Sequence, residues 1–530
     1  MLMTIHANGR QHTANLVGID DMSLYVPRTY LSMEVLAEAR GYELPKLRDG
    51  LGLQAMAFPD AHEDTATMAA NAVLDLIEKN QLDPRQIGRI YMGTESALDG
   101  SKPTATYVLA MLTNYFEKEY GPDCFLNCDV VDLTFACIGA VDALQNTLDW
   151  VRGDGARIAI VVSADIAKYE LGSAGEYTQG AGAIALLVRQ NPRLLSIDGN
   201  WGVATRSVHD FFKPIRTFSK KQVVEEVLKL AGLSNISAEN ILAGLPETLE
   251  VTGFLDSNEM GISLHKETPM VDGPYSNQCY QQRIRESLQS FAELNRLTPQ
   301  TPVTERWQRM AFHLPYAYQA RRMFSEIFFE EAVKSGKWPE IQKELSVQQP
   351  SPEEFDSFEA YEVAYSNFLR AITKTKAYRR IVEHKIEKGE RASSLIGNMY
   401  TSSIFLAFMS TLAADFSENA DLEGALVGFF AYGSGSKSKV FEGTVQPQWR
   451  QIVQRWKVME RLQERQPLDY ATYEKLHRQA LQESVGAVSG EFYLHEVNDA
   501  PGNYTGARSY QWHYTKKTDA AISPTVKPQL

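Results

Sequence analysis

Three side chains able to perform nucleophilic and acid–base chemistry stand where short apolar runs end. They are Cys137, Glu95 and His313. A thiol can carry an acyl group, a carboxylate can move a proton, and an imidazole can orient a carbonyl or donate a proton. Singly, each has a plainer interpretation, as a buried cysteine, a loop carboxylate or a core histidine. Together they supply a nucleophile, a base and an electrophile without fixing the reaction.

Cys137 stands where a strand pattern gives way to a helical one. The apolar spacing over residues 137–151 predicts a helix that begins at the cysteine. The N–H groups and partial positive charge at a helix N-terminus ease ionisation of a thiol and can hold the oxyanion of a thioester under attack. The small neighbours Ala136, Gly139 and Ala140 would leave room for an acyl group.

The elements that must position these residues alternate along the chain. Helical spacing is found over 68–79, 103–120, 137–151 and 398–412, and strand-like runs over 90–93, 128–133, 157–165, 182–188, 310–312 and 426–432. This alternation favours an α/β fold. Because the second half repeats the order of the first, we expect a duplicated α/β unit with active residues meeting at the junction of the halves.

The pattern divides the chain into two halves with additions. We expect an N-terminal half over residues 16–192 and a C-terminal half over residues 193–500. Charged stretches at about 215–268 and 336–392 interrupt the second half and predict peripheral helical insertions. The polar ends, 1–15 and 503–530, are expected to be loosely packed tails.

Composition narrows the class of protein. The 530-residue chain is 44% hydrophobic and has a formal net charge of -13, which disfavours binding to nucleic acid. It contains no apolar run long enough for a membrane span and no recognisable secretory signal. Four cysteines are too few for a disulfide framework, and no cluster has metal-ligand spacing. We therefore expect a cytoplasmic protein without a structural metal.

A series of short motifs runs through most of the chain. In order they are GID at 18–20, YVP at 25–27, LAEAR at 36–40, GTES at 93–96, DGSK at 99–102, AC at 136–137, SADIAKY at 163–169, YTQGAGA at 177–183, DFFKP at 210–214, VDG at 271–273, FHLPY at 312–316, GNMYT at 397–401 and FAYGSG at 430–435. In this order they resemble the hydroxymethylglutaryl-CoA (HMG-CoA) synthase family of the thiolase superfamily.

The resemblance implies a fold and an activity. The fold would be thiolase-like, with two duplicated α/β halves in a layered α-β-α-β-α core and helical insertions in the second half. The activity would be that of an acyltransferase that converts acetyl-CoA, acetoacetyl-CoA and water into HMG-CoA and CoA, as in mevalonate synthesis. The resemblance also implies a homodimer and no cofactor beyond the CoA thioesters.

The same resemblance implies roles for individual residues. Cys137 would carry the acetyl group, Glu95 would act as general acid and base, and His313 would orient the acetoacetyl thioester. Substrate-binding residues would be Asn398, Ser434, Tyr169, Thr178 and Gly435, and supporting acids would be Asp99, Asp165 and Asp210.

Two departures from the family pattern keep alternatives open. Ile138 replaces an aromatic residue after the nucleophile, and Tyr318 replaces a lysine near CoA, although Arg321 and Arg322 follow one turn later. The first alternative is a polyketide β-branching synthase that acts on a β-keto group carried by an acyl carrier protein. A ketoacyl synthase would leave Glu95 unexplained. A non-enzymatic thiolase-fold scaffold is disfavoured by the intact set of Cys137, Glu95, His313 and Asn398.

Overall fold

The structure is a computed structural model that describes residues 16–233, 235–244, 261–298, 300–486, 488–500 and 504–513. The expected tail 1–15 lies outside the described residues. Strands from both halves join in one ten-stranded sheet, with the order β14-β15-β16-β8-β1-β7-β6-β4-β5 and β9 paired to β16.

The N-terminal half supplies five strands of this sheet. They are β1 (Val17–Tyr25), β4 (Ile87–Gly93), β5 (Asp129–Leu133), β6 (Ile158–Ala167) and β7 (Gly180–Gln190). Strands β5, β4 and β6 are parallel, while β7 is antiparallel to both of its neighbours, β6 and β1. The runs predicted as strands around 90–93, 128–133, 157–165 and 182–188 are all found here.

The C-terminal half repeats this pattern. Its strands are β8 (Leu195–Ile197), β9 (Gly202–Thr205), β14 (Arg309–Phe312), β15 (Leu426–Gly433) and β16 (Lys437–Val445). Strand β14 is parallel to β15, as β4 is to β6, and β16 is antiparallel to β15, as β7 is to β6. The pair β8 and β9 borders β16 as β1 borders β7. The predicted duplication is therefore confirmed by strand order and direction.

Alternation of side chains along the strands explains the layers. Val161 and Leu186 face one way, into a core with α4 (Gly139–Gly153) and α13 (Ser403–Ser417). Their neighbours face the other way, towards α2 (Thr65–Lys79) and α3 (Thr104–Tyr120). In the second half, Phe429 faces the central core, while Phe430 packs with α7 (Gly273–Leu294) and α8 (Gln319–Lys334).

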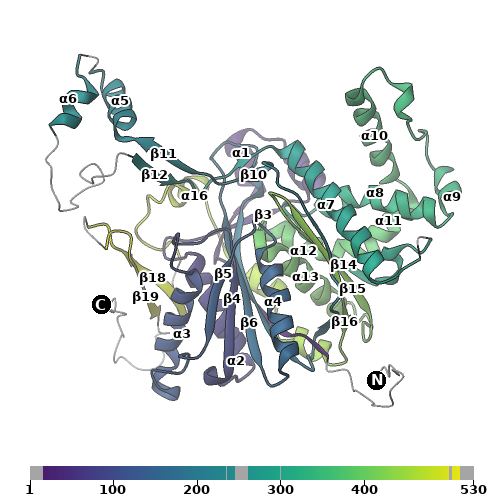
Figure 1. The fold of residues 1–530 in the computed structure, drawn as a ribbon, viewed down its shortest axis with the longest axis horizontal. Coiled ribbons are helices and arrows are strands. Elements are labelled where there is room, and N and C mark those ends of the chain that lie inside the picture. The colour runs from purple at the N-terminus through teal and green to yellow at the C-terminus, as the bar shows by residue number, and fades with distance from the viewer. Residues whose placement is uncertain are drawn as a thin grey trace.

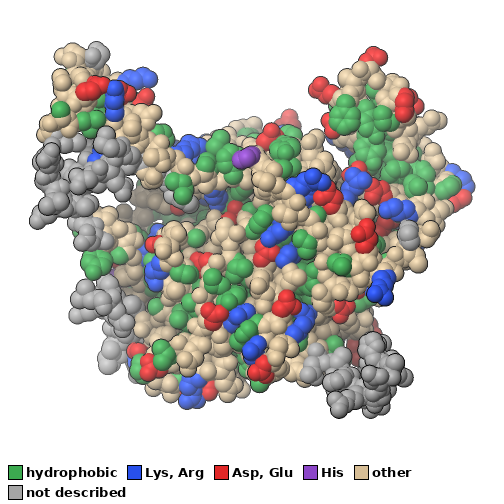
Figure 2. Space-filling view, in the orientation of Figure 1, with side chains coloured by type: hydrophobic (Ala, Val, Ile, Leu, Met, Phe, Trp, Pro, Cys, Tyr) green, Lys and Arg blue, Asp and Glu red, His purple; other side chains and the backbone are tan. Residues whose placement is uncertain are grey.

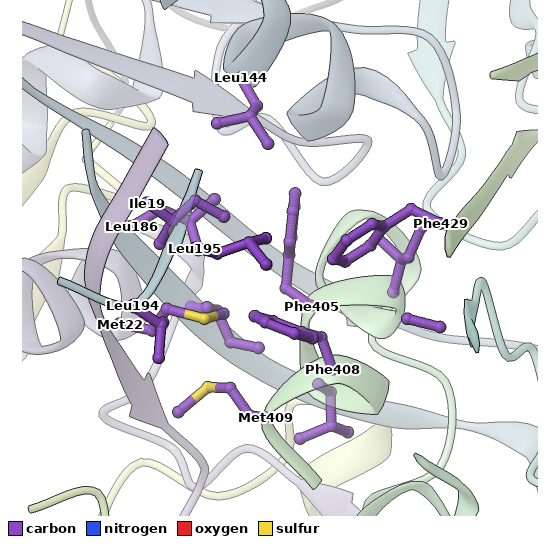
Figure 3. Packing of buried hydrophobic residues seen from close by; sticks show 14 of the residues in the cluster. Ile19, Met22, Leu144, Leu186, Leu194, Leu195, Phe405, Phe408, Met409 and Phe429 are labelled. Atoms are coloured by element: carbon purple, nitrogen blue, oxygen red, sulfur yellow. The ribbon is translucent and has the colours of Figure 1, made fainter. Parts of the chain in front are cut away.

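Each half of the ten-stranded sheet therefore forms its own layer. The order is outer helices, N-terminal half of the sheet, central helices, C-terminal half of the sheet and outer helices, as the resemblance implies. Figure 1 shows α4 and α13 in the middle of the molecule. In Figure 3, Leu144 of α4 and Phe405, Phe408 and Met409 of α13 meet side chains from both halves of the sheet.

Two arms extend from this core (Figure 1). The first is a two-stranded ladder of β11 (Ile215–Ser219) and β12 (Gly261–His265), with α5 (Lys220–Leu230) and α6 (Ala238–Ala243) beyond it. The second holds α9 (Trp338–Gln342), α10 (Phe358–Ile372) and α11 (Lys376–Ile381). Figure 2 shows hydrophobic side chains gathered on the α10 arm, where Phe358 is 71% exposed.

The predicted insertion over 336–392 extends too far. Helix α12 (Glu387–Ile396) packs along α13, and Ala392 and Ile396 are fully buried in the central core. Its many charged residues suggested a peripheral segment. One face of the helix nevertheless carries small and apolar residues that fit against α13.

The expected C-terminal tail is also partly structured. Strand β19 (Arg508–His513) pairs with β18 (Glu491–Val497), and Trp512 stacks edge-on against Tyr115 of α3 with ring centroids 4.8 Å apart. The remaining elements are β2 (Thr29–Ser32), α1 (Met33–Arg40), β3 (Ala55–Phe58), β10 (Phe211–Phe212), β13 (Met270–Val271), α14 (Trp449–Val453), α15 (Val458–Gln463), β17 (Gln466–Pro467) and α16 (Tyr470–His477). Within the described ranges, no helix is long and apolar enough to cross a membrane.

Candidate active site

Cys137 lies in a tight turn between β5 and α4. The sequence predicted a helix that begins at Cys137, but the helix begins at Gly139, so the cysteine lies in the turn before it. The preceding residue, Ala136, has a left-handed backbone with φ of 40°. The thiol is only 8% exposed and packs in a small cluster with Ala167 and Tyr400.

Glu95 is the direct partner of this thiol. The Cys137 Sγ donates a hydrogen bond to Glu95 Oε1 at 3.0 Å. Burial raises the pKa of the Cys137 thiol well above its ordinary value, and the Glu95 carboxylate raises it further. The expectation that a helix N-terminus would ease ionisation of the resting thiol is therefore wrong. In the resting state the proton therefore stays on sulfur, and the hydrogen bond places Glu95 where it can accept that proton when the thiol reacts.

The pKa of Glu95 suits it to this exchange. Burial raises the pKa of Glu95 to about 7, with the positive charge of Lys213 opposing the rise and the negative charge of Asp165 adding to it. A group with a pKa near the working pH can both accept and return a proton. Glu95 can therefore act as a general base and as a general acid in the same cycle.

Asp165 fixes the backbone of Glu95. One oxygen of its fully buried carboxylate accepts the Glu95 N–H at 2.8 Å and the Thr94 hydroxyl at 2.9 Å. The other oxygen accepts the Thr401 N–H at 3.0 Å and the Thr401 hydroxyl. Asp165 therefore joins the strand end that carries Glu95 to a loop from the C-terminal half.

That loop places Asn398 at the junction of the halves. The helix predicted from residue 398 begins at Ser403, so Asn398 lies in the loop before it. Its N–H donates to the Thr178 carbonyl at 3.0 Å, and its Oδ1 accepts the Tyr400 N–H at 2.8 Å. Gly397 has φ of 85°, and a Cβ there would stand 1.9 Å from a backbone oxygen of Gln179. Only glycine allows this close approach.

The turn after β15 is pressed against the Cys137 turn. A Cβ on Gly433 would meet the Phe135 carbonyl oxygen at 2.7 Å and the Ile138 nitrogen at 3.0 Å. Asp210, which is fully buried, accepts the Gly435 N–H at 2.7 Å and the Tyr432 hydroxyl at 2.9 Å. Ser434 and Gly435 are thereby held beside the nucleophile's turn.

His313 directly follows β14, as Glu95 follows β4. Its ring is 2% exposed, and burial lowers its pKa to about 3, so the imidazole is neutral. In the described part of the chain, its Nδ1 has no hydrogen-bond partner. The hydroxyl of Tyr280 donates to the His313 carbonyl at 2.8 Å. A neutral ring with a free nitrogen can orient a substrate carbonyl.

Of the remaining predicted residues, Tyr169 packs against the Cys137 cluster, and Thr178 donates to the Gly175 carbonyl at 2.8 Å. Among the described residues, Asp99 makes no hydrogen bond to Cys137, Glu95 or His313. It is exposed, and its carboxylate accepts the N–H groups of Ser101 and Lys102 at 2.7 Å each, which shapes the turn before α3. Because Asp99 lies in a motif close to Glu95 in the sequence, its exposed position in this turn was not predicted.

Tyr318 stands where the family pattern has a lysine, and the nearby Arg321 is already paired and is not free to take over that role. It donates to the buried carboxylate of Glu390, and its guanidinium lies 3.9 Å from the centroid of the Tyr318 ring. These residues line a cavity of about 550 Å³. Arg322 is more exposed and bonds the Gly50 carbonyl at 2.7 Å.

Residue types alone did not single out three members of the site. Tyr400 walls the Cys137 thiol, Thr401 anchors Asp165, and Lys213 donates to the Glu95 carbonyl at 3.2 Å. All three lie in motifs that carry the family resemblance, so position within those motifs was the signal that could have found them. No group of three or more residues suited to hold a metal ion occurs in the ranges that the structure describes.

Two family models match most of this chain. Residues 13–192 match the family model for hydroxymethylglutaryl-coenzyme A synthase N terminal, and residues 262–499 match that for its C terminal. A hydroxymethylglutaryl-CoA synthase of Haloferax volcanii is 29% identical over 465 residues, covering 87% of this chain and 91% of the relative. One of Schizosaccharomyces pombe is 27% identical over 507 residues, covering 91% and 96%.

Solved structures agree on the fold. A structure of MvaS in complex with 3-hydroxy-3-methylglutaryl coenzyme A has a TM-score of 0.70 and 26% identity, covering 94% of this chain and all of that one. The curacin biosynthetic pathway HMG synthase has a TM-score of 0.63 at 20% identity, with the same coverage. The chain belongs to the hydroxymethylglutaryl-CoA synthase family of acyltransferases, with the thiolase-like fold of that family.

Proposed function

We propose that this protein condenses acetyl-CoA with acetoacetyl-CoA and water to give 3-hydroxy-3-methylglutaryl-CoA and CoA. The observation that carries the proposal is the part-buried contact of 3.0 Å between Cys137 Sγ and Glu95 Oε1, close to the junction of the two halves. It joins an acyl carrier to a proton shuttle, which are the two groups that this reaction needs.

The first step is acylation of Cys137. Glu95 takes the thiol proton as Sγ attacks the thioester carbonyl of acetyl-CoA. The tetrahedral oxyanion is stabilised by backbone N–H groups of the Cys137 turn and of Ser434. When the intermediate collapses, CoA leaves as a thiolate, takes the proton from Glu95, and acetyl-Cys137 remains. Ala167, Tyr400 and Tyr169 surround the sulfur and exclude bulk water from the acetyl group.

The second step forms the carbon–carbon bond. Glu95, again a carboxylate, takes a proton from the acetyl methyl group, and the enolate attacks the ketone carbon of acetoacetyl-CoA. The new alkoxide receives that proton from Glu95. His313, as a neutral imidazole, and Asn398, whose Oδ1 already accepts the Tyr400 N–H, orient the acetoacetyl carbonyls. Water then hydrolyses the thioester and frees HMG-CoA and the Cys137 thiol.

The test is release of CoA by the purified protein. We expect CoA release and HMG-CoA formation that require both substrates and are lost in Cys137→Ser and Glu95→Ala. Formation of an acetyl-enzyme without any HMG-CoA from acetoacetyl-CoA would contradict the acceptor in this proposal. A carrier-protein-bound acetoacetyl group would then be tested as the acceptor. Absence of acetylation at Cys137 would contradict the enzymatic proposal itself.

The proposal also includes a cytoplasmic homodimer that needs no cofactor beyond its CoA thioesters. Support comes from the family membership and from the composition of the chain. Light scattering of the purified protein measures the assembly, and a monomer at micromolar concentration would contradict the dimer. Activity that survives extensive dialysis against a chelator is expected if no metal takes part.

A further inference from the structure

Lys213 is a cation placed directly against the acid–base pair. Its Nζ donates to the backbone carbonyl of Glu95 at 3.2 Å and lies 5.0 Å from the centroid of the Tyr400 ring. The side chain is half-buried. Its ammonium group therefore touches the residue that carries the proton and the residue that walls the thiol.

The segment that carries Lys213 is held at several points. The Val208 N–H donates to the Gly435 carbonyl at 2.9 Å, and the Asp210 carboxylate accepts the Gly435 N–H. Phe211 pairs with Val271 in the ladder of β10 and β13. Pro214 follows directly and restricts the backbone of Lys213 to extended conformations. The lysine is thus delivered to Glu95 by a segment braced on the turn beside the nucleophile.

Lys213 forms no direct ion pair with a carboxylate in the described ranges, although its charge acts on the Glu95 carboxylate. Lys168 forms an ion pair with Glu267 at 2.8 Å, and Lys437 pairs with Asp142, whereas Lys213 forms no such pair in these ranges. The groups that interact electrostatically with Glu95 are Lys213, Asp165, Cys137, Tyr169 and Tyr400. Lys213 is the member of this set that bears a positive charge.

We propose that Lys213 is a positioning residue of the reaction proposed above. Its ammonium group fixes the Glu95 segment over Cys137 and supplies the positive charge that keeps the Glu95 carboxylate ready to accept a proton. The inference rests on the proposed function for its kinetic consequence, but not for its effect on the thiol. Consistent with it, Lys213 lowers the pKa of both Glu95 and Cys137, against the effect of burial.

The kinetic test compares Lys213→Met, Lys213→Arg and the control Lys168→Met. Removal of the Lys213 charge should raise the pKa of the Glu95 carboxyl group by about one unit. With the pKa of Glu95 starting at about 7, its ionised fraction at pH 7 falls from about one half to about one eleventh. We expect Lys213→Met to lose activity about fivefold at pH 7 and hardly at all at pH 9, in kcat more than in KM.

The other variants sharpen this test. Lys213→Arg keeps the charge and should restore most of the activity, and Lys168→Met should match the wild type at every pH. An unchanged pH profile in Lys213→Met would overturn the proposal. An equal loss at all pH values would overturn it too, since that points to a purely structural role, and so would a loss confined to KM, since that points to a contact with CoA.

A second readout does not depend on turnover. The rate of alkylation of Cys137 by iodoacetamide is followed by mass spectrometry of the peptide that contains it, between pH 6 and 10. We expect Lys213→Met to be alkylated several-fold more slowly at pH 8 than the wild type and Lys213→Arg to be close to it. Equal rates in all variants would refute the electrostatic role. If the wild type makes no HMG-CoA but its alkylation depends on Lys213, the proposed function fails, and of this inference only the electrostatic effect of Lys213 on the Cys137 thiol stands.

Discussion

Replacement of Gly433 by alanine tests how closely the two halves must meet at the nucleophile. A Cβ there would stand 2.7 Å from the Phe135 carbonyl oxygen, whereas ordinary contacts begin at 3.4 Å. The Phe135 carbonyl oxygen belongs to the backbone, so the turn after β15 and the Cys137 turn must separate by about 0.7 Å even if the Ile138 side chain, 2.8 Å from the added Cβ, moves aside. Overpacking of this kind costs about 1–3 kcal/mol of stability.

The catalytic cost follows from the same displacement. Misplacement of catalytic groups by about 1 Å slows a reaction by about 10²-fold. We therefore expect Gly433→Ala to slow the acylation of Cys137 by acetyl-CoA about 10- to 100-fold, because the donors of the Cys137 turn and of Ser434 no longer converge on one oxyanion.

The assay is formation of acetyl-enzyme in a single turnover, followed by rapid quench and mass spectrometry. Gly199→Ala is the matched control, since a Cβ on Gly199 would meet nothing within 4 Å. The reasoning is refuted if Gly433→Ala folds and acylates at the wild-type rate, or if Gly199→Ala is slowed as much.

Three further predictions follow from the described contacts. Glu95→Gln removes the proton acceptor for Cys137, so acylation should fall by about 10²- to 10⁴-fold while circular dichroism stays unchanged. Phe408→Ala empties a fully buried position beside Phe429 and should cost about 3–5 kcal/mol, seen as a lower urea midpoint. Burial raises the pKa of Glu63 to about 7 from 4.5, so the folded state binds this proton more tightly than the unfolded state. Stability should therefore fall by up to about 3 kcal/mol as the pH rises from 4.5 through 7, and Glu63→Gln should remove that dependence in urea titrations at several pH values.

The local pattern of the chain was enough to predict the main strands and helices of the core. Strands β6 and β7 are largely apolar and buried, and α2 and α4 carry apolar residues at helical spacing, so a short window of sequence was enough to predict each of them. The repeated order of strands and helices was likewise enough to predict the duplication. Residue type and place at the end of a strand singled out Cys137, Glu95 and His313, and motif order then indicated the family.

Boundaries and burial were less well predicted, for an identifiable reason. Helix α12 looked peripheral because charged residues surround its small apolar face, and only the presence of α13 gives that face a partner. Asp99 looked like part of the site because it lies close to Glu95 in sequence, but the turn that holds it points to solvent. Periodicity reports the state of a segment and not what packs against it.

The sequence by itself therefore determined the α/β elements, their repeated order, and the kinds of group available for chemistry. Only the tertiary structure decided the protonation of those groups, because the pKa of a buried side chain depends on its neighbours in space. Cys137 is a protonated thiol that donates a hydrogen bond to Glu95, and the His313 imidazole is neutral. Lys213 lowers the pKa of Glu95, against the rise that burial causes. These partners are far apart in the chain, and the folding together of the two halves brings them within hydrogen-bond and electrostatic range.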